Sequence, residues 1–498
     1  MEHPLHASFV FVYLLVLVGV GAMKARKITD QEGFALAGRG LPTWVLVGTL
    51  LATWIGTGSI VANAEYTFNF GAPALLLPMA GSLGVLALYC LAKRIRTFEQ
   101  FTIQDILEAR FGLAARILAT LALLGAYVII VSYQYRSGAV VLEYVMPSLR
   151  TMENGNAYAI VGVAVFVIAY TALAGMYSVA YTDVANGVLM AVGIAVALPI
   201  LLSQAGGWEH AIAQLPEGSR EVTDHWTAIK LLGVLLPPFL LIIGDANMYQ
   251  RFFSARSPQS ARRSAVGMFV GVLMMEVAII AVALLSTSLV AQGKLSMPDK
   301  PAHIIIHAAF NALPPVLGAL LIGTVVAIVV STADSYLLSP ATSVVRDIYQ
   351  RFINPKAEGK QVVFISRVCV VGLGLLALGL AFTSDNFFDV AIFAYTIYGC
   401  AITPVILAAF FWKRANHAGA VASIVTGGCV ALLWESVGHF RGGEMQWADS
   451  LSELLTIGGV DLVGDVKAVL VAFPLAVAAL VLVSLATKPP TDTQSTSI

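Results

Sequence analysis

Charged residues are scarce in this chain. Asp, Glu, Lys and Arg make up only 12% of the 498 residues, whereas they make up about one quarter of a typical soluble domain. Hydrophobic residues account for 58%, and the mean hydropathy is +0.83. These values exclude an ordinary soluble protein and predict an all-α protein that crosses a membrane many times.

Cysteine and the usual signs of catalysis are also scarce. The four cysteines lie in apolar segments and form neither a CxxC pair nor a Cys/His zinc spacing, so we expect no disulfide and no zinc at Cys90, Cys369, Cys400 or Cys429. The chain has no nucleophile–base motif and no phosphate-binding loop. We therefore predict that it is not an enzyme, and we infer neither a nucleic-acid partner nor an obligatory protein partner.

The chain is rich in apolar segments of about 20 residues, the length that crosses a bilayer as a helix. We place thirteen of them near residues 7–23, 42–64, 72–92, 114–147, 156–174, 177–203, 227–248, 264–291, 312–338, 363–383, 387–411, 418–437 and 465–487. The lipid bilayer is therefore the expected surrounding of the protein. The Pro/Thr/Ser-rich residues 488–498 are expected to form a disordered cytoplasmic tail.

Basic residues are distributed unevenly between the loops. If the N-terminus lies outside and the spans alternate, 21 of the 29 Lys and Arg residues fall on the inner side or its edges. Because basic loops stay in the cytoplasm, we predict an outside N-terminus and a cytoplasmic C-terminus. The basic residues at 24–27 follow the first span instead of preceding it, so this span is predicted to be a retained anchor.

The inner loop between residues 93 and 116 has a regular segment. Residues 102–112 have the amphipathic pattern of a short helix on the cytoplasmic surface. Thr102 is placed to cap this helix, Asp105 falls in its first turn, and Gly112 ends it.

Two spans contain helix breakers at membrane depth. The second span carries the Gly-rich residues 54–59, and the seventh carries Pro237-Pro238 followed by Gly244-Asp245. Broken backbone inside a bilayer is tolerated where it lines a cavity or is buried in protein. Because the two spans are five apart, they predict two inverted repeats with a ligand site near the midplane. Two ordinary kinks are the alternative.

A group of hydroxyls interrupts the ninth span. Ser331 and Thr332 follow a long uncharged stretch, and bare hydroxyls at membrane depth cost free energy unless something binds them. One interpretation is an oxygen cage for a small alkali cation, completed by the carbonyls of Trp54, Thr57 and Ile328. The alternative is that both hydroxyls bond back to carbonyls one turn earlier in their own helix.

Two acidic residues belong to the same region. Asp183 lies about one turn inside the sixth span, where it is either a second ion ligand or a carboxylate that reaches back to the interface. Asp334 follows Thr332 in the ninth span, and the sequence identifies no partner for it. In a proton-coupled carrier, either Asp183 or Asp334 would be the titrating group.

A solute site is predicted from one basic residue, one acidic residue and several aromatic residues. Arg136 is the only basic residue well inside a span, and it either clamps a solute carboxylate or pairs internally with Asp245 or Glu143. Asp245 beside an aromatic wall would recognise an ammonium group, so a zwitterion would satisfy both charged residues. The aromatic candidates are Trp54, Tyr133, Tyr135 and Tyr249.

An ordered set of short motifs resembles the sodium:solute symporter family. This family includes bacterial proline, pantothenate, sialic acid and galactose symporters and animal glucose, iodide and choline carriers. The pieces that match, in family order, are FALAGR at 34–39, TIQDILEARFG at 102–112, GMYSVAYTD at 175–183, QRF at 250–252 with SAR at 254–256, ST at 331–332 through DIY at 347–349, and Pro404 with WKR at 412–414 and Gly419. Each piece is short, but the ordered set is specific.

The resemblance implies a LeuT-like fold in a single membrane domain, residues 1–490. Its parts would be an extra N-terminal helix at 7–23, two inverted five-helix repeats at 42–203 and 227–411, and two additional helices at 418–487. The resemblance also implies that sodium is the coupling ion. It assigns the shared sodium site to Ser331, Thr332, Ile328, Trp54 and Thr57, and a second site in some members to Asp183.

We therefore predict a sodium-coupled symporter that imports a small organic solute by alternating access, located in a cell membrane and expected in the bacterial inner membrane. The solute class stays open between an amino acid, a carboxylate and a quaternary ammonium compound. Residues 52–58 resemble the choline-carrier branch, Arg136 lies near the arginine that binds a carboxylate in the sialic acid branch, and Gly244-Asp245 departs from the proline and pantothenate pattern. The alternatives are a proton-coupled carrier of the same fold, a transporter-like sensor and a channel.

Overall fold

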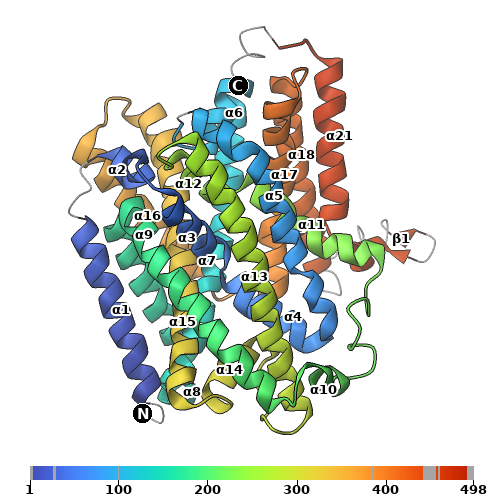
Figure 1. Ribbon diagram of the computed structural model, residues 1–498. Helices are drawn as coiled ribbons and strands as arrows, with labels where there is room; N and C mark the ends of the chain where they lie inside the picture. The colour runs from blue at the N-terminus through green and yellow to red at the C-terminus, as the bar shows by residue number, and fades with distance from the viewer. Residues whose placement is uncertain are drawn as a thin grey trace.

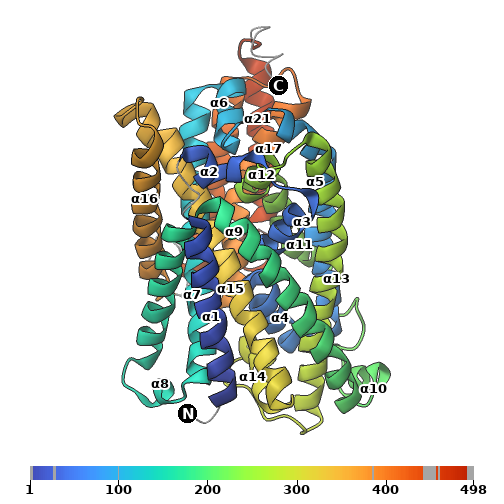
Figure 2. The same ribbon diagram turned by 60° about the vertical axis from the view of Figure 1, so that its left-hand side comes forward.

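The computed structural model describes residues 4–25, 30–98, 100–383, 386–440, 456–457 and 460–490. Long helices that share one general direction make up most of this part of the chain (Figures 1 and 2). A two-residue pairing of β1 (Thr456–Ile457) with β2 (Val460–Asp461) is the only sheet among the described residues. The predicted all-α class is confirmed. Most of the predicted tail, residues 491–498, lies outside the described residues.

Apolar runs form long helices because a bilayer offers no partner to an unpaired backbone group. In the first half of the chain the helices are α1 (Pro4–Ala25), α2 (Gln31–Leu36), η1 (Ala37–Arg39), α3 (Thr43–Trp54), η2 (Gly58–Ala62), α4 (Asn63–Phe70), η3 (Ala72–Leu76), α5 (Pro78–Thr97), α6 (Ile103–Phe111), α7 (Leu113–Val145), α8 (Ser148–Thr151), α9 (Gly155–Gln204) and α10 (Trp208–Ala213). In the second half they are α11 (Ala228–Gly244), α12 (Ala246–Phe253), α13 (Pro258–Ala291), η4 (Pro301–His303), α14 (Ile304–Asn311), α15 (Pro315–Ser343), η5 (Val344–Ile353), α16 (Gly359–Leu380), α17 (Phe387–Phe411), α18 (His417–Phe440), α20 (Leu462–Asp465) and α21 (Val469–Ala486).

The number of membrane-length helices differs from the prediction. In the described chain, eleven helices are long and apolar enough to cross a membrane, or twelve when the bent pair at Thr43–Trp54 and Gly58–Phe70 counts as one span. The predicted number of thirteen is therefore not confirmed. The difference lies in α9, which is counted once although it contains the predicted spans 156–174 and 177–203.

The backbone of α9 reverses direction at Gly175, where φ is 62° and ψ is 170°. A straight helix of 50 residues would be about 75 Å long, well over the ~30 Å of the hydrocarbon core. The flanking elements α8 and α10 both lie at the lower end of the molecule in Figures 1 and 2, so α9 crosses the bundle and returns. Glycine adopts the positive φ of this turn without steric cost.

The predicted break in the second span is present. α3 ends at Trp54, Ile55 is extended with φ −72° and ψ 90°, and the helix resumes at Gly58 after a bend of 53°. The break faces α15, which together with α17 is the most deeply buried of the long helices in the described chain. α1 and α21 lie on opposite flanks of the bundle (Figure 1). The interrupted backbone is therefore enclosed by protein.

The seventh span breaks at one of its two predicted positions. α11 continues through Pro237-Pro238 and ends at Gly244. Asp245 is extended, with φ −66° and ψ 113°, and its side chain accepts a hydrogen bond from the backbone N–H of Asn247 at the start of α12. The interruption thus results from the capping aspartate, and the proline pair does not break α11.

The helix predicted at residues 102–112 is present as α6. Thr102 caps it and forms a reciprocal capping box with Asp105, and Gly112 follows its last residue with a φ of 87°. In Figure 1 α6 lies at the end of the bundle opposite to α8 and α10. Local start and stop signals are sufficient here because each acts within one turn of the helix.

Candidate functional site

The break after α3 places backbone carbonyls against the hydroxyls of α15. Ser331 Oγ lies 2.9 Å from the carbonyl oxygen of Ala52 and 3.2 Å from that of Ile328. Thr332 Oγ1 lies 3.3 Å from the carbonyl oxygen of Ile55 and 3.4 Å from that of Ala52. All five residues are buried. Two hydroxyls and three carbonyls from two helices therefore form one oxygen cluster at membrane depth.

The α3 carbonyls in this cluster are two residues earlier than the sequence predicted. Ala52 and Ile55 supply them, in place of Trp54 and Thr57. The N–H of Ile55 still donates to the Leu51 carbonyl at 2.8 Å. Ala52 follows Leu51, so its carbonyl is the first one after the last backbone hydrogen bond of α3. The extended backbone of Ile55 then determines which carbonyls face α15.

Trp54 and Thr57 are held by other contacts. The indole Nε1 of Trp54 donates to Glu276 Oε1 at 2.9 Å. Thr57 Oγ1 donates to Gln134 Oε1 at 2.5 Å, and the Thr57 backbone N–H points to the same oxygen at 3.3 Å. These bonds connect the two sides of the break to α7 and α13.

Gly56 allows the broken helix to approach α15 closely. A Cβ atom at this position would lie 2.9 Å from Thr332 Cγ2 and 3.0 Å from Thr332 Oγ1. Because Thr332 has no room to move in a packed interior, a larger residue would separate the carbonyls from the hydroxyls. The glycine is thus a requirement of the oxygen cluster.

Asp183 does not lie at the membrane interface. Its side chain is fully buried, and Oδ2 accepts a hydrogen bond from Thr49 Oγ1 at 2.6 Å. The guanidinium of Arg251 lies 3.4 Å from the same oxygen and donates to Ser335 Oγ at 2.7 Å. The Asp183 side chain is therefore enclosed by protein and does not reach solvent, and a cation built into the chain already faces it.

Asp334 is linked to this guanidinium through Ser335. Asp334 is buried, and its Oδ1 accepts a 3.3 Å hydrogen bond from Ser335 Oγ. Within the described chain, neither Asp334 Oδ2 nor Asp183 Oδ1 has a hydrogen-bond partner. Arg251 was not identified from the sequence, because it follows the seventh span at the predicted cytoplasmic edge, where an arginine is ordinarily exposed.

Asp245 is saturated by tyrosines. Oδ1 accepts from the Tyr127 hydroxyl at 2.7 Å and from the Asn247 backbone N–H at 2.7 Å, and Oδ2 accepts from the Tyr336 hydroxyl at 2.9 Å. Tyr249 is buried nearby on α12, and its hydroxyl has no hydrogen-bond partner among the described residues. Both oxygens of Asp245 are thus engaged within the protein.

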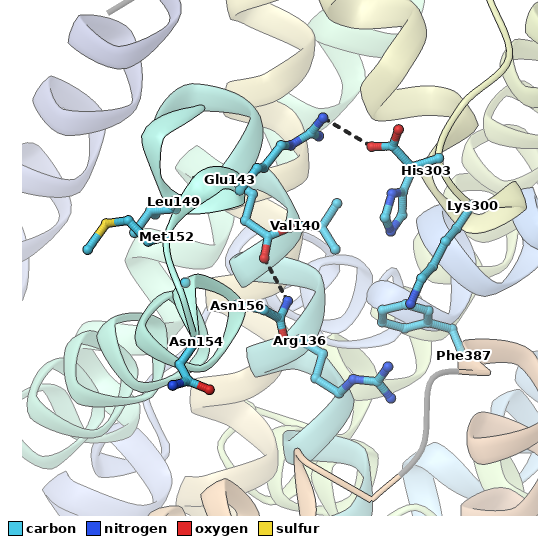
Figure 3. Close-up of a pocket in the computed structure, with 13 residues that line it drawn as sticks. Arg136, Val140, Glu143, Leu149, Met152, Asn154, Asn156, Lys300, His303 and Phe387 are labelled. Atoms are coloured by element: carbon cyan, nitrogen blue, oxygen red, sulfur yellow. Dashed lines mark hydrogen bonds and ion pairs between the residues drawn. The ribbon is translucent and has the colours of Figure 1, made fainter.

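Arg136 lines a cavity at the lower end of the bundle, shown in Figure 3. The cavity has a volume of about 660 Å³ and also contains Glu143, Lys300, His303 and Phe387. The Arg136 guanidinium lies 5.0 Å from the centroid of the Phe387 ring, and Glu143 accepts a 2.7 Å hydrogen bond from an asparagine of α9.

Arg136 and Asp245 lie in different surroundings. Asp245 contacts Tyr127, which lies on α7 nine residues before Arg136. Nine residues of helix correspond to about 13 Å of rise. Arg136 lines the lower cavity, whereas Asp245 is held by tyrosines.

A second cavity lies directly at the break in the second span. Its volume is about 50 Å³, and its lining includes Trp54, Ser59, Glu276, Phe388 and Tyr395. Tyr133 reaches its edge, since the hydroxyls of Tyr133 and Tyr395 are 3.2 Å apart. Of the predicted aromatic residues, Trp54 therefore lines this cavity, and Tyr133 contacts its wall through Tyr395. Glu276 was missed by the sequence analysis.

The membrane-length helices form a bundle with an oxygen cluster on one side of a central helix break and a cavity on the other. This is the architecture of a secondary transporter. The chain belongs to the sodium:solute symporter family, whose model matches residues 34–427. It is 26% identical to the high-affinity proline transporter of Bacillus subtilis (strain 168), with 85% of this chain and 90% of that protein covered. It is 24% identical to the sodium/proline symporter of Salmonella typhimurium (strain LT2), with 87% and 88% covered.

The fold is also similar to solved transporter structures. A Na⁺-coupled sialic acid symporter in a substrate-bound outward-open state aligns with a TM-score of 0.80 at 16% identity, covering 98% of both chains. MhsT in complex with L-phenylalanine aligns with a TM-score of 0.56 at 14% identity, covering 89% of this chain and 97% of that one. The predicted LeuT-like fold and family resemblance are confirmed. The protein is a transporter and not an enzyme, and its family assigns sodium as the coupling ion.

Proposed function

We propose that the protein imports a small organic solute together with sodium bound at the oxygen cluster. Ser331 and Thr332 would supply two hydroxyls, and Ala52, Ile55 and Ile328 would supply carbonyls. The cluster itself carries this proposal, because neutral hard oxygens suit an alkali cation and hold it weakly enough for release. Residues 42–203 and 227–411 are the proposed repeats that move against each other.

The break couples the two ligands. The carbonyls of Ala52 and Ile55 face the proposed sodium, while Trp54 and Ser59 on the same segment face the cavity. Sodium would stabilise the broken conformation and so form the solute cavity in advance. Each ligand would then raise the affinity of the other by the same factor.

L-Proline is the first solute to test, because relatives of 24–26% identity are proline transporters. We place the protein in a bacterial inner membrane with its N-terminus outside. The decisive measurement is uptake of radiolabelled solutes into proteoliposomes with and without an inward sodium gradient. Uptake that is equal under both conditions for every transported solute would exclude sodium coupling.

Replacing both hydroxyls tests the ion site. In Ser331→Ala with Thr332→Ala, the sodium concentration for half-maximal uptake is expected to rise by about tenfold or more, because two of five ligands are lost. Ser286→Ala is a matched control, since Ser286 is a buried hydroxyl on α13 that bonds only to its own helix. Unchanged sodium dependence in the double variant would contradict the assignment.

A proton-coupled carrier is the second candidate, and Asp334 favours it. This buried carboxylate has one oxygen without a partner in the described chain, and its other oxygen accepts a hydrogen bond from Ser335. In that case a pH gradient without sodium would drive uptake in proteoliposomes. Asp334→Asn would abolish this uptake, whereas it would leave a sodium-driven uptake in place.

A further inference from the structure

Glu276 is a carboxylate in the middle of an apolar helix. It lies on α13, and the sequence has no other charged residue between Arg263 and Lys294. The side chain is buried, at 5% exposure. Such a group is costly in free energy unless hydrogen-bond donors or a cation compensate its charge.

The contacts of Glu276 engage only one of its two oxygens. Trp54 Nε1 donates to Oε1 at 2.9 Å, and Ser59 Oγ donates to the same atom at 3.2 Å. In the part of the chain that the structure describes, Oε2 accepts no hydrogen bond and no basic side chain pairs with the carboxylate. Oε2 therefore remains for a ligand.

The cavity beside Glu276 has the chemistry of a cation site. Three aromatic residues share its lining with the carboxylate, and its described lining contains no Lys, Arg or His. Ring faces attract a cation, most strongly where water is excluded. A lone carboxylate among aromatic rings therefore favours a positive group and rejects an anion. The aromatic residues are Trp54, Phe388 and Tyr395.

Two other buried carboxylates near the break are already compensated within the protein. Asp245 accepts two tyrosine hydroxyls and a backbone N–H. Asp183 faces the guanidinium of Arg251 at 3.4 Å. Glu276 is thus the carboxylate that lines the cavity at the break and has no internal cation.

We propose that Glu276 recognises the solute, and that the solute carries a cationic nitrogen placed between this carboxylate and the rings of Trp54 and Tyr395. The inference rests on the proposed function, because it names the class of solute that the symporter carries. It also explains how the solute acts on the helix break. A cation at Glu276 would bind the same carboxylate that accepts hydrogen bonds from Trp54 and Ser59. These two residues lie on opposite sides of the break.

Two pairs of probes that differ mainly in the cationic nitrogen test this proposal: L-proline with tetrahydrofuran-2-carboxylate, and choline with 3,3-dimethylbutan-1-ol. Binding to the purified full-length protein in sodium is measured by thermal shift. The wild type is expected to prefer the nitrogen-containing member of at least one pair by about tenfold or more. Glu276→Gln is expected to lose this preference, because its amide keeps an acceptor for Trp54 and Ser59 but has no charge. Glu276→Asp is expected to keep it.

Glu435→Gln is the matched control, because Glu435 is a half-buried carboxylate on α18 outside the cavity lining. It should leave the preference unchanged. A wild type that responds to no nitrogen-containing probe, or a Glu276→Gln protein that keeps the preference, overturns the proposal. The effect of sodium alone on the melting temperature should be the same in Glu276→Gln as in the wild type. Failure of sodium coupling is detected separately in the proteoliposome assay.

Discussion

At the scale of single residues, His303 lies in an environment that disfavours its charged form. It is a buried residue at the wall of the lower cavity (Figure 3). Burial lowers the pKa of its imidazole from 6.5 to about 4, and the positive charge of Lys300 contributes in the same direction. The folded protein therefore holds His303 neutral at a pH where the unfolded chain binds a proton.

This difference predicts that acid destabilises the protein. The unfolded state takes up a proton near pH 6.5 and the folded state only near pH 4, so the free energy of unfolding falls as pH drops through this window. The loss from this residue is at most about 3 kcal/mol. Melting temperatures at pH 7.5 and 5 should differ less in His303→Gln than in the wild type. His210→Gln, a change at an exposed residue of α10, should leave the difference unaltered.

At the level of single residues, the sequence carried a chemical signal but no information on backbone register. Ser331 and Thr332 were singled out because hydroxyls at membrane depth are costly. The pairs Ala52–Ile55 and Trp54–Thr57 have the same spacing, and only the extended conformation of Ile55 distinguishes them. Glu276 had the same kind of signal as Ser331, a polar group inside an apolar run, and was identifiable from the sequence.

At the scale of elements, α6 is tied to its neighbours by a buried ion cluster. Arg116 on α7 lies 2.7 Å from Asp105 of α6 and 2.5 Å from Asp347 of η5, and it also pairs with Glu108. Arg116 and both aspartates are buried. One guanidinium therefore joins three elements at the end of the bundle that we propose to be cytoplasmic.

Removal of this guanidinium should loosen the α6 end of the molecule. Arg116→Gln leaves the buried Asp347 without its cation and leaves Asp105 with only Arg346, 3.8 Å away. The expected cost is about 3–5 kcal/mol of stability. Arg351→Gln is the control. Its side chain is half exposed and pairs only with Glu108 at 2.6 Å, so the expected cost is about 1 kcal/mol or less. Equal melting temperatures for the two variants would contradict the structural role of Arg116.

At the scale of the whole molecule, the two ends of the bundle carry different short helices. α8 and α10 lie at the lower end, where α1 begins, and α6 and α12 lie towards the upper end (Figures 1 and 2). The predicted inner basic residues include those near α6 and α12. The arrangement predicts that the lower end faces the outside of the cell.

Cysteine labelling of intact cells tests this orientation. In a variant whose four native cysteines are replaced by alanine, Ser148→Cys on α8 should react with a membrane-impermeant maleimide. Gln259→Cys, near the start of α13, should react only after the membrane is permeabilised. Both positions are exposed in the structure, so access to solvent is matched. The reverse labelling pattern would place the N-terminus inside.

The fold was largely predictable because the bilayer restricts the possible structures. Apolar length located most spans, and the Gly-rich segment at 54–59 located the central break. The predicted number of spans was not confirmed, because a sharp turn at Gly175 joins two predicted spans into α9. Arg251 could not be assigned, because burial of an arginine at the end of a span depends on contacts between α3, α9, α12 and α15 that are distant in sequence.

Arg251 is part of the chain, so its positive charge stays in the protein while sodium and solute pass through. Moving one elementary charge through a potential of 100 mV is worth about 2.3 kcal/mol. The guanidinium lies 3.4 Å from Asp183 and balances its charge. Because it does not cross the membrane, it adds nothing to the electrical work of a transport cycle. In an electrical recording, the charge carried per solute molecule therefore reports the diffusible ions and the solute themselves, and gives their stoichiometry directly.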